Sequence, residues 1–386
     1  MVERPGNIVV GLDIGTTKIC AVVGEFNEKG AEIIGVGTYP SVGLRKGVVV
    51  NIDNTVDSIQ RAIEDAELMA GREIGSVFIG IAGSHIKGFN SHGVIAVKGQ
   101  EVSQEDVDRV IDAARAVAIP LDREVIHILP QEYIVDKQGG ILDPVGITGV
   151  RLEAKVHIVT GAVTAAQNLI KCSNRAGLDV VDIVFQPLAS AEAVLTQEEK
   201  DLGVALIDFG GGTTDLALFT ESAIKHTAVL GLGGNNLTND IAVGLRTPSK
   251  KAEQIKIRNG SCINSLIDKE QMIEVEIFTL IDQEIERTEL KELLASGVVI
   301  TGGSALLPGI AEIADQVFQL PTRIGFPRRI SGLVDVVNGP MFATAVGLVL
   351  YGMEYQSQKK FRIRDGNIFN RVTLRMKSWF KIQKNS

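Results

Sequence analysis

The sequence predicts a two-lobed α/β protein that carries an inserted α+β subdomain. Its 386 residues are more than one hydrophobic core usually holds. Hydrophobic residues make up 45% of the chain and aromatic residues only 5%, with 41 glycines, a balance typical of proteins built around buried sheets. One strand, turn, strand pattern also occurs twice, near the start and near the middle of the chain. These three observations together indicate the fold class.

Residues 1–83 predict three strands, a helix and a fourth strand, which we assign to lobe I. The runs NIVVGLDIG, KICAVVGEF and AEIIGVGTY are separated by glycine or by short polar turns. NTVDSIQRAIEDAELMAG (54–71) then has apolar residues at helical spacing and a terminal glycine. VFIGIAG predicts a further buried strand. This order indicates a mixed sheet rather than the strict alternation of a dinucleotide-binding fold.

Residues 84–161 predict the inserted subdomain. It contains HGVIAVKG, a capped helix SQEDVDRVIDAARAVAI, and the strand-like runs REVIHILPQEYIVD and VRLEAKVHIVTGA. A helix around 164–176 then returns the chain to lobe I, 162–196, and lobe II follows over 197–338. GPMFATAVGLVLYG (339–352) is too short to span a bilayer, so we expect a buried helix that closes lobe I.

Charge and cysteine content narrow the class of protein. The formal net charge is −8, yet nine basic residues and one acid, Asp365, follow residue 357. The acidic body argues against a nucleic-acid partner, whereas the basic end suits an anionic surface. Three widely spaced cysteines and five histidines without ligand spacing predict neither a disulfide framework nor a metal-bound histidine cluster, and they suit a reducing, cytoplasmic setting. The N-terminus shows no leader, so we expect neither secretion nor an integral membrane protein.

The repeated pattern pairs VVGLDIGTTKICAVV (9–23) with ALIDFGGGTTDLALF (205–219). In each copy a glycine turn joins two strands, unlike the strand-to-helix loops of dinucleotide folds. Asp13 and Asp208 end the first strands, where they suit a hydrated Mg²⁺ that bridges phosphates. Each hairpin alone could be a tight turn that satisfies its own backbone, but two copies favour phosphate binding. The candidate phosphate contacts are Gly15, Thr16, Thr17, Lys18, Gly210, Gly211, Gly212, Thr213 and Thr214.

Three later segments suit the rest of a nucleotide. GLGGNNLTNDIA (231–242) is a glycine turn that opens a helix, where amide groups favour phosphate, with Gly233, Gly234 and Asn235 as candidates. AEQIKI (252–257) places Glu253 and Lys256 on one helical face, within reach of a nucleoside, although an exposed ion pair is the alternative. VVITGGSALLPGI (298–310) predicts a tight turn against an adenosine. Its candidates are Gly302, Gly303 and Ser304.

Longer blocks carry a resemblance to a known family. GSHIKGFNSHGVIAV, IPLDREVIHILPQEYIVD, DPVGITGVRLEAKVHIVTGA and QPLASAEAVL resemble the FtsA family of bacterial cell-division proteins, within the actin-like ATPase clan. The resemblance implies a two-lobed actin-like ATPase fold that binds ATP and Mg²⁺, with Asp208 catalytic and Gln186 orienting the attacking water. A neutral glutamine is a poor base, so at most slow hydrolysis is implied, and a cap on the helix after Gln186 is the alternative role.

The resemblance also implies partners and a location. FtsA proteins polymerise, receive the C-terminal tail of FtsZ on lobe II, recruit other division proteins and tether the FtsZ ring to the cytoplasmic face of the membrane as peripheral proteins. Near Glu276 and Ile277 this chain has roughly two dozen residues fewer than the family pattern, through a deletion or through residues outside this sequence. The alternatives are a small-molecule kinase of the same clan and a pilus-assembly or rod-shape ATPase.

The C-terminal segment predicts an amphipathic membrane helix. Residues 353–367 suit a flexible basic linker, and 368–386 wind into a helix with an apolar stripe and cationic flanks. A terminal helix docked on its own domain is the alternative. The residues expected at an anionic membrane are Phe369, Arg371, Val372, Arg375, Met376, Lys377, Trp379, Phe380 and Lys381.

Overall fold

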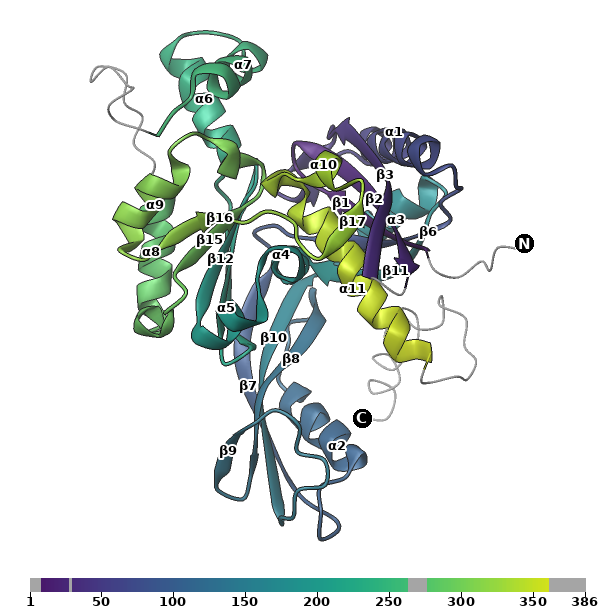
Figure 1. Ribbon diagram of the computed structural model, residues 1–386, viewed down its shortest axis with the longest axis vertical. Helices are drawn as coiled ribbons and strands as arrows, with labels where there is room; N and C mark the ends of the chain where they lie inside the picture. Colours follow the sequence, from purple (N-terminus) through teal and green to yellow (C-terminus); the bar gives the residue numbers. More distant parts are fainter. Residues whose placement is uncertain (1–7, 28–29, 263–275, 361–386) are drawn as a thin grey trace.

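The computed structural model describes residues 8–27, 30–262 and 276–360 of the chain. Two lobes lie side by side, and a third unit projects from beneath both of them (Figure 1). The segments 263–275 and 361–386 fall outside the described residues. The expected membrane helix and most of the expected linker therefore lie outside them as well.

Lobe I is built on a mixed six-stranded sheet. In spatial order its strands are β11 (Asp179–Phe185), β6 (Ser76–Ile81), β1 (Ile8–Ile14), β2 (Lys18–Asn27), β3 (Gly30–Pro40) and β17 (Ile330–Gly332). Strand β1 pairs antiparallel with β2 and parallel with β6, so the expected mixed sheet is confirmed. The short strands β4 (Leu44–Arg45) and β5 (Val48–Val49) form a separate hairpin.

Helices α1 (Ile52–Ala70) and α3 (Val163–Arg175) bury their apolar sides against this sheet. The Asn51 side chain accepts a hydrogen bond from the backbone N–H of Asn54 and so caps the start of α1. Gly71 ends α1 in the left-handed conformation, at φ 62°, which a side chain with a Cβ disfavours. The helix end expected at Gly71 is therefore confirmed.

Lobe II repeats the same strand arrangement. Its sheet has the order β14 (Ala223–Leu230), β13 (Thr214–Thr220), β12 (Val204–Phe209), β15 (Val298–Thr301) and β16 (Thr322–Ile324). Strand β12 pairs antiparallel with β13 and parallel with β15, as β1 does with β2 and β6. Around it lie α5 (Gln197–Leu202), α6 (Gly234–Gly244), α7 (Ser249–Asn259), α8 (Glu276–Arg287) and α9 (Ile310–Phe318). The sequence repeat is thus a structural repeat.

The third unit has a sheet in the order β7 (Lys87–Ala96), β10 (Arg151–Ala162), β8 (Arg123–Val135) and β9 (Gln138–Ile141). Helix α2 (Gln104–Arg115) packs against it, with Val110 and Ala114 in a core separate from those of the lobes. Ser103 and Asp106 form the expected capping box. The expected helix was too long, however, because α2 ends at Arg115, short of the predicted SQEDVDRVIDAARAVAI segment's last residue, Ile119.

Helices α4 (Gln186–Val194) and α11 (Ala343–Lys360) cross between the two lobes (Figure 1). A Cβ at Gly347 would lie 1.8 Å from the carbonyl oxygen of Ala189, so this crossing requires a glycine. Helix α11 follows the short helix α10 (Val334–Val337) and a 3₁₀ turn at Pro340–Phe342, and it continues to Lys360. The expected linker is therefore wrong over 353–360, because the helix does not stop at residue 352. Across the described part of the chain, no helix combines the length and the apolar character that crossing a bilayer requires.

A buried histidine joins the third unit to lobe II. His157 of β10 is 1% exposed. Its Nδ1 lies 2.7 Å from Oδ1 of Asn90 on β7, and its Nε2 lies 2.8 Å from Oγ1 of Thr227 on β14. Gln131 adds bonds from its side-chain amide to the carbonyls of Ile224 and Lys225. A neutral ring that donates from Nδ1 to Asn90 and accepts from the Thr227 hydroxyl satisfies both nitrogens.

This histidine predicts a pH dependence of folding stability. Burial, with a smaller effect of His226, lowers the pKa of His157 from 6.5 to about 4. Between these values the unfolded chain binds the proton and the folded chain does not, so stability falls as the pH falls through this window. From pH 7 to pH 5 the loss is expected to be about 2 kcal/mol from this residue. Urea unfolding of wild type and of His157→Gln at both pH values measures this effect. The other titrating groups contribute equally to both proteins, so their contributions cancel when the two pH dependences are subtracted. An equal pH dependence of both proteins would contradict the expectation.

Candidate functional site

The two glycine hairpins meet tip to tip between the lobes. Each turn closes with the same bond, from Gly15 N–H to the carbonyl of Lys18 and from Gly210 N–H to that of Thr213, both at 3.0 Å. A Cβ at Gly211 would lie 2.4 Å from Cγ2 of Thr17. One at Gly212 would lie 2.7 Å from Cγ2 of Thr16. The glycines therefore allow the two turns to approach each other, and a bulkier residue would push the lobes apart.

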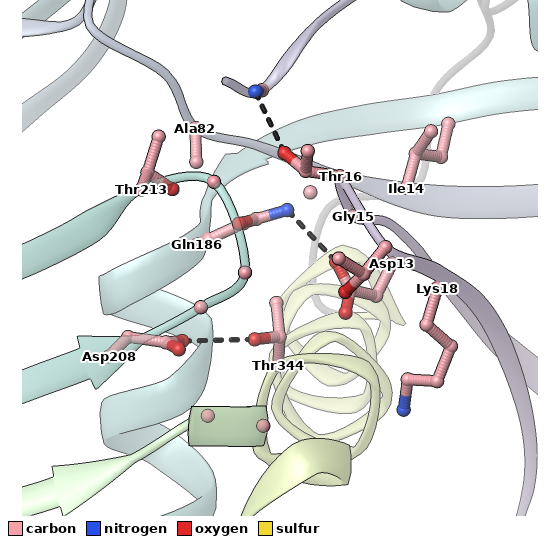
Figure 2. Close-up of a pocket in the computed structure, with 18 of the residues that line it drawn as sticks. Asp13, Ile14, Gly15, Thr16, Lys18, Ala82, Gln186, Asp208, Thr213 and Thr344 are labelled. Atoms are coloured by element: carbon pink, nitrogen blue, oxygen red, sulfur yellow. Dashed lines mark hydrogen bonds between the residues drawn. The ribbon is translucent and has the colours of Figure 1, made fainter. Parts of the chain in front are cut away.

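A cavity of about 150 Å³ lies beside this contact. Figure 2 shows side chains from both hairpins, from α4 and from α11 around it. Expected residues that line it are Asp13, Gly15, Thr16, Thr17, Lys18, Gln186, Asp208, Gly210, Gly211, Gly212, Thr213, Gly302 and Gly303. The sequence did not single out the remaining lining residues, Ile14, Gly47, Gly80, Ala82, Leu169, Asp215, Met341 and Thr344. Most of these are small or apolar and carry no local signal of a site.

Three buried carboxylates face this cavity. Asp13, Asp208 and Asp215 are 9%, 8% and 3% exposed. Burial raises the pKa of Asp13 to about 7, with Lys18 opposing and Asp208 adding to the shift. Burial also raises the pKa of Asp208, and it raises that of Asp215 well above the usual value, with the charge of Asp208 adding. Three acids that resist ionisation without a partner form an environment suited to a cation.

Asp215 is the functional candidate that the sequence reasoning missed. Its Oδ2 accepts a hydrogen bond from the Thr213 hydroxyl at 3.0 Å, whereas its buried Oδ1 has no partner among the described residues. The signal was present, because Asp215 directly follows the Thr-Thr pair of the second hairpin, where Lys18 follows that pair in the first. The two hairpins therefore differ at this matched position, where the first has a base and the second has an acid.

Gln186 is the first residue of α4, and its side chain is directed into the cavity. Its Nε2 donates to Oδ1 of Asp13 at 2.9 Å (Figure 2). The N-cap residue of α4 is Phe185, and no side chain caps this helix. The alternative role of Gln186 as a helix cap is therefore wrong, and the residue contacts a cavity carboxylate instead.

Lys18 is anchored away from the hairpin tips. Its Nζ donates to the carbonyl of Met341 at 2.8 Å and lies 4.2 Å from the centre of the Phe342 ring. The ammonium group therefore stabilises the turn before α11 as well as lining the cavity. The same side chain would therefore serve both as the expected point charge toward a ligand and in this structural contact.

The remaining expected residues gather behind the second hairpin, outside the cavity lining. The amides of Gly234 and Asn235 donate to the carbonyls of Gly210 and Gly211 at 3.0 and 2.7 Å, so they are already engaged. The Ser304 hydroxyl also donates to Gly210, at 2.9 Å. The amide of Gly233 donates to the side-chain oxygen of Asn236. The ammonium group of Lys256 donates to the carbonyl of Gly234 and forms an ion pair with Glu253. The Thr214 hydroxyl donates to the carbonyl of Leu232. These contacts make the second hairpin, α6, α7 and the 302–304 turn one rigid wall.

The donor set offers carboxylate oxygens to a hydrated cation. Within residues 8–27, 30–262 and 276–360, no three His, Cys, Asp or Glu side chains are close enough to ligate one metal ion. Asp13 and Asp208 nevertheless offer hard oxygen ligands, as Mg²⁺ prefers, and the unpartnered oxygen of Asp215 is a third acceptor. This chemistry fits a hydrated Mg²⁺.

Structural neighbours share the fold at low sequence identity. A chain of the PilM-PilN type IV pilus biogenesis complex has a TM-score of 0.71 at 19% identity, covering 89% of this chain and 98% of that one. MreB5 of Spiroplasma citri bound to ADP has a TM-score of 0.54 at 16% identity, covering 92% and 99%. The same protein bound to AMPPNP also has a TM-score of 0.54, at 15% identity, covering 93% and 100%. The expected actin-like ATPase fold is thus confirmed.

Sequence relatives assign the family. The family model "Cell division protein FtsA" matches residues 205–347, and "SHS2 domain inserted in FTSA" matches 83–160. The cell division protein FtsA of Pseudomonas aeruginosa is 49% identical, covering 92% of this chain and 91% of its own. That of Escherichia coli K12 is 40% identical, with 97% and 96% covered. The latter alignment extends over 407 positions, so the relative has residues that this chain lacks. The chain belongs to the FtsA family of cell division proteins.

Proposed function

We propose that the chain binds ATP with Mg²⁺ between its two hairpins. The observation that carries this proposal is the pair of matched glycine hairpins around one cavity with three buried carboxylates. The nucleotide complexes of the MreB5 neighbour support the choice of ligand. Asp13 and Asp208 would hold the hydrated ion, which neutralises phosphate charge when bound. The hairpin glycines and the hydroxyls of Thr16, Thr17 and Thr213 would contact phosphate.

Nucleotide binding requires the lobes to separate. The cavity measures about 150 Å³, whereas pockets for small molecules usually measure about 300–1,000 Å³. Because Gly211 and Gly212 touch the first hairpin, opening this contact is the direct way to enlarge the cavity. The wall made by α6, α7 and Ser304 would then contact the nucleoside, with Glu253 and Lys256 at its edge.

Slow hydrolysis is the most that these residues support. Gln186 can orient a water molecule, but a neutral amide does not accept its proton. Its hydrogen bond to Asp13 also couples any bound water to the cation site. A protein with such a site suits a nucleotide-controlled assembly better than a high-turnover kinase.

We propose further that the protein forms filaments, binds the FtsZ tail and other division proteins, and anchors the FtsZ ring to the cytoplasmic face of the membrane as a peripheral protein. Family membership and the basic C-terminal segment support this adaptor function. The pilus-assembly neighbour shares 19% identity, against 49% with an FtsA protein, so the family evidence favours division over pilus assembly. A small-molecule kinase would need a base for an acceptor hydroxyl, whereas the cavity carboxylates of the described residues are assigned here to the cation site.

Helices α6 and α7 are the proposed site for the FtsZ tail. Three apolar side chains of this unit are largely exposed: Val243 on α6 (70%), Leu245 at the C-cap of α6 (60%) and Ile257 on α7 (71%). Exposed apolar side chains that gather on one small unit suit an interaction site. The exposed Arg246 follows the end of α6, and the exposed Arg258 lies on α7. An apolar surface with basic neighbours suits a short peptide that carries both apolar and acidic residues.

Cosedimentation with FtsZ polymers tests the adaptor function. Wild type is expected to pellet with FtsZ, and Leu245→Ser is expected to lower the bound fraction several-fold, because burial of one leucine contributes about 2 kcal/mol. Leu68→Ser is the matched control, since Leu68 is 82% exposed on α1 of the other lobe. Equal pelleting of both variants would remove α6 and α7 from the interface. Rapid phosphate transfer from ATP to a small acceptor would instead favour the kinase.

A further inference from the structure

The carboxylate of Asp208 is held by two hydroxyl groups that no sequence motif singles out. Ser190 Oγ lies 2.8 Å from Oδ2 of Asp208, and Thr344 Oγ1 lies 3.2 Å from the same atom. The two hydroxyl oxygens lie 3.0 Å apart. Ser190 is 0% exposed and Thr344 is 7% exposed, so water does not readily replace either contact. Both hydroxyls donate to this oxygen, and such hydrogen bonds favour the charged form of a carboxylate.

The second oxygen of Asp208 lies against the Gly302 turn, which lines the cavity. A Cβ built on Gly302, which lines the cavity, would lie 2.5 Å from Oδ1 of Asp208. The two oxygens therefore differ in their surroundings. Oδ2 accepts hydrogen bonds from the Ser190 and Thr344 hydroxyls, while Oδ1 lies beside Gly302. Figure 2 shows Thr344 and Asp208 directed toward each other, from α11 and β12.

The hydroxyls come from the helices that cross between the lobes. Ser190 lies one turn after Gln186 on α4, and Gln186 donates to Asp13 of the first hairpin at 2.9 Å. One helix thus contacts a carboxylate from each lobe. Thr344 lies at the start of α11, shortly after Met341, whose carbonyl accepts from Lys18. The tight packing of Gly347 on Ala189 holds α4 and α11 at a defined separation.

We propose that Ser190 and Thr344 are positioning residues for the cation site: they hold Oδ2 of Asp208 so that Oδ1 would be left available to a cation. The helices α4 and α11 would then set the spacing between Asp13 and Asp208. This inference rests on the proposed binding of Mg²⁺ and ATP. Partners that orient a metal ligand usually matter for metal affinity nearly as much as the ligand itself. In this scheme both hydroxyls act through the Asp208 carboxylate, so removal of either one lowers the contribution of Mg²⁺ more than it lowers metal-free binding of ATP.

Calorimetric titration of ATP in excess Mg²⁺ and in EDTA tests the inference. The measured quantity is the ratio of the two affinities, for wild type, Ser190→Ala and Thr344→Val. Each variant is expected to lower this ratio by about tenfold or more. Thr344→Ser, which keeps the hydroxyl, is expected to retain the wild-type ratio. Ser173→Ala is the matched control for loss of a buried helical hydroxyl, since Ser173 is 0% exposed and donates to Leu169 within α3.

The outcomes separate this inference from the proposed function. A wild-type ratio near one would overturn both the role of Mg²⁺ and the positioning role. A large wild-type ratio that persists in Ser190→Ala and Thr344→Val would overturn the positioning role alone. A purely structural role of the hydroxyls would weaken binding equally in Mg²⁺ and in EDTA and so leave the ratio unchanged. Thermal unfolding of each variant without ligand confirms that the proteins compared are folded.

Discussion

Replacing Asp208 by asparagine is expected to lower the affinity for Mg²⁺-ATP by about a hundredfold or more. The loss of one charged partner from a buried site costs about 2–5 kcal/mol, and each 1.4 kcal/mol is a factor of ten in affinity. The substituted amide would keep the shape of the side chain and an oxygen that accepts from Ser190 and Thr344, so the effect isolates the charge. Isothermal calorimetry measures the change. Asp57→Asn is the control, since Asp57 is exposed on α1, away from the cavity.

The same substitution is expected not to destabilise the protein without ligand. Burial raises the pKa of Asp13, Asp208 and Asp215, so their charges are unfavourable in the folded state at neutral pH. One neutral side chain among them removes mutual repulsion, and the melting temperature is expected to stay equal or to rise. Full affinity for Mg²⁺-ATP in a folded Asp208→Asn protein would remove Asp208 from the cation site. A lower melting temperature, or a protein that no longer folds, would contradict the expectation on stability.

Removal of residues 368–386 is expected to abolish binding to anionic vesicles. This segment has five basic residues and no acid, and each basic residue near an anionic surface contributes about 1 kcal/mol. The loss of about 5 kcal/mol corresponds to more than a thousandfold in affinity, before any contribution of the apolar residues of the segment is counted. Flotation with vesicles that contain an anionic lipid measures the bound fraction. Vesicles of neutral lipid, and full-length protein with Arg371→Gln and Arg375→Gln, serve as controls for the charge contribution.

Trp379 distinguishes membrane insertion from docking of the tail on its own domain. It is the only tryptophan of the chain, so its emission reports on this segment alone. Insertion into the interface of an anionic bilayer is expected to shift the emission to shorter wavelength, because the indole leaves water. An emission spectrum that vesicles leave unchanged, together with flotation of the truncated protein, would contradict the proposal that this segment binds the membrane. A single tail binds weakly, so assembly of the protein into filaments would multiply the attachment.

The interior of the fold follows from short-range features of the sequence. Strand β1, helix α1 and strand β6 occur in the expected order because apolar periodicity and the caps at Asn51 and Gly71 act within a few residues of chain. The repeated Asp, glycine and Thr-Thr pattern likewise predicted both hairpins. The end of α11 could not be read in this way, because polar residues after Tyr351 are compatible with either a helix or a linker.

What the sequence by itself determined is the pair of hairpins and the acids that end their first strands, since each is encoded in one continuous stretch. Only the tertiary structure decided what these residues touch. It placed the Gln186 amide on Asp13, the Lys18 ammonium on the Met341 carbonyl, and two hydroxyls on Asp208. It also left the buried Oδ1 of Asp215 without a partner among the described residues. Thr344 is 136 residues from Asp208 along the chain, and the approach of the start of α11 to the end of β12 brings them together. Such contacts depend on helix packing across the lobes, which no local spacing of residues specifies.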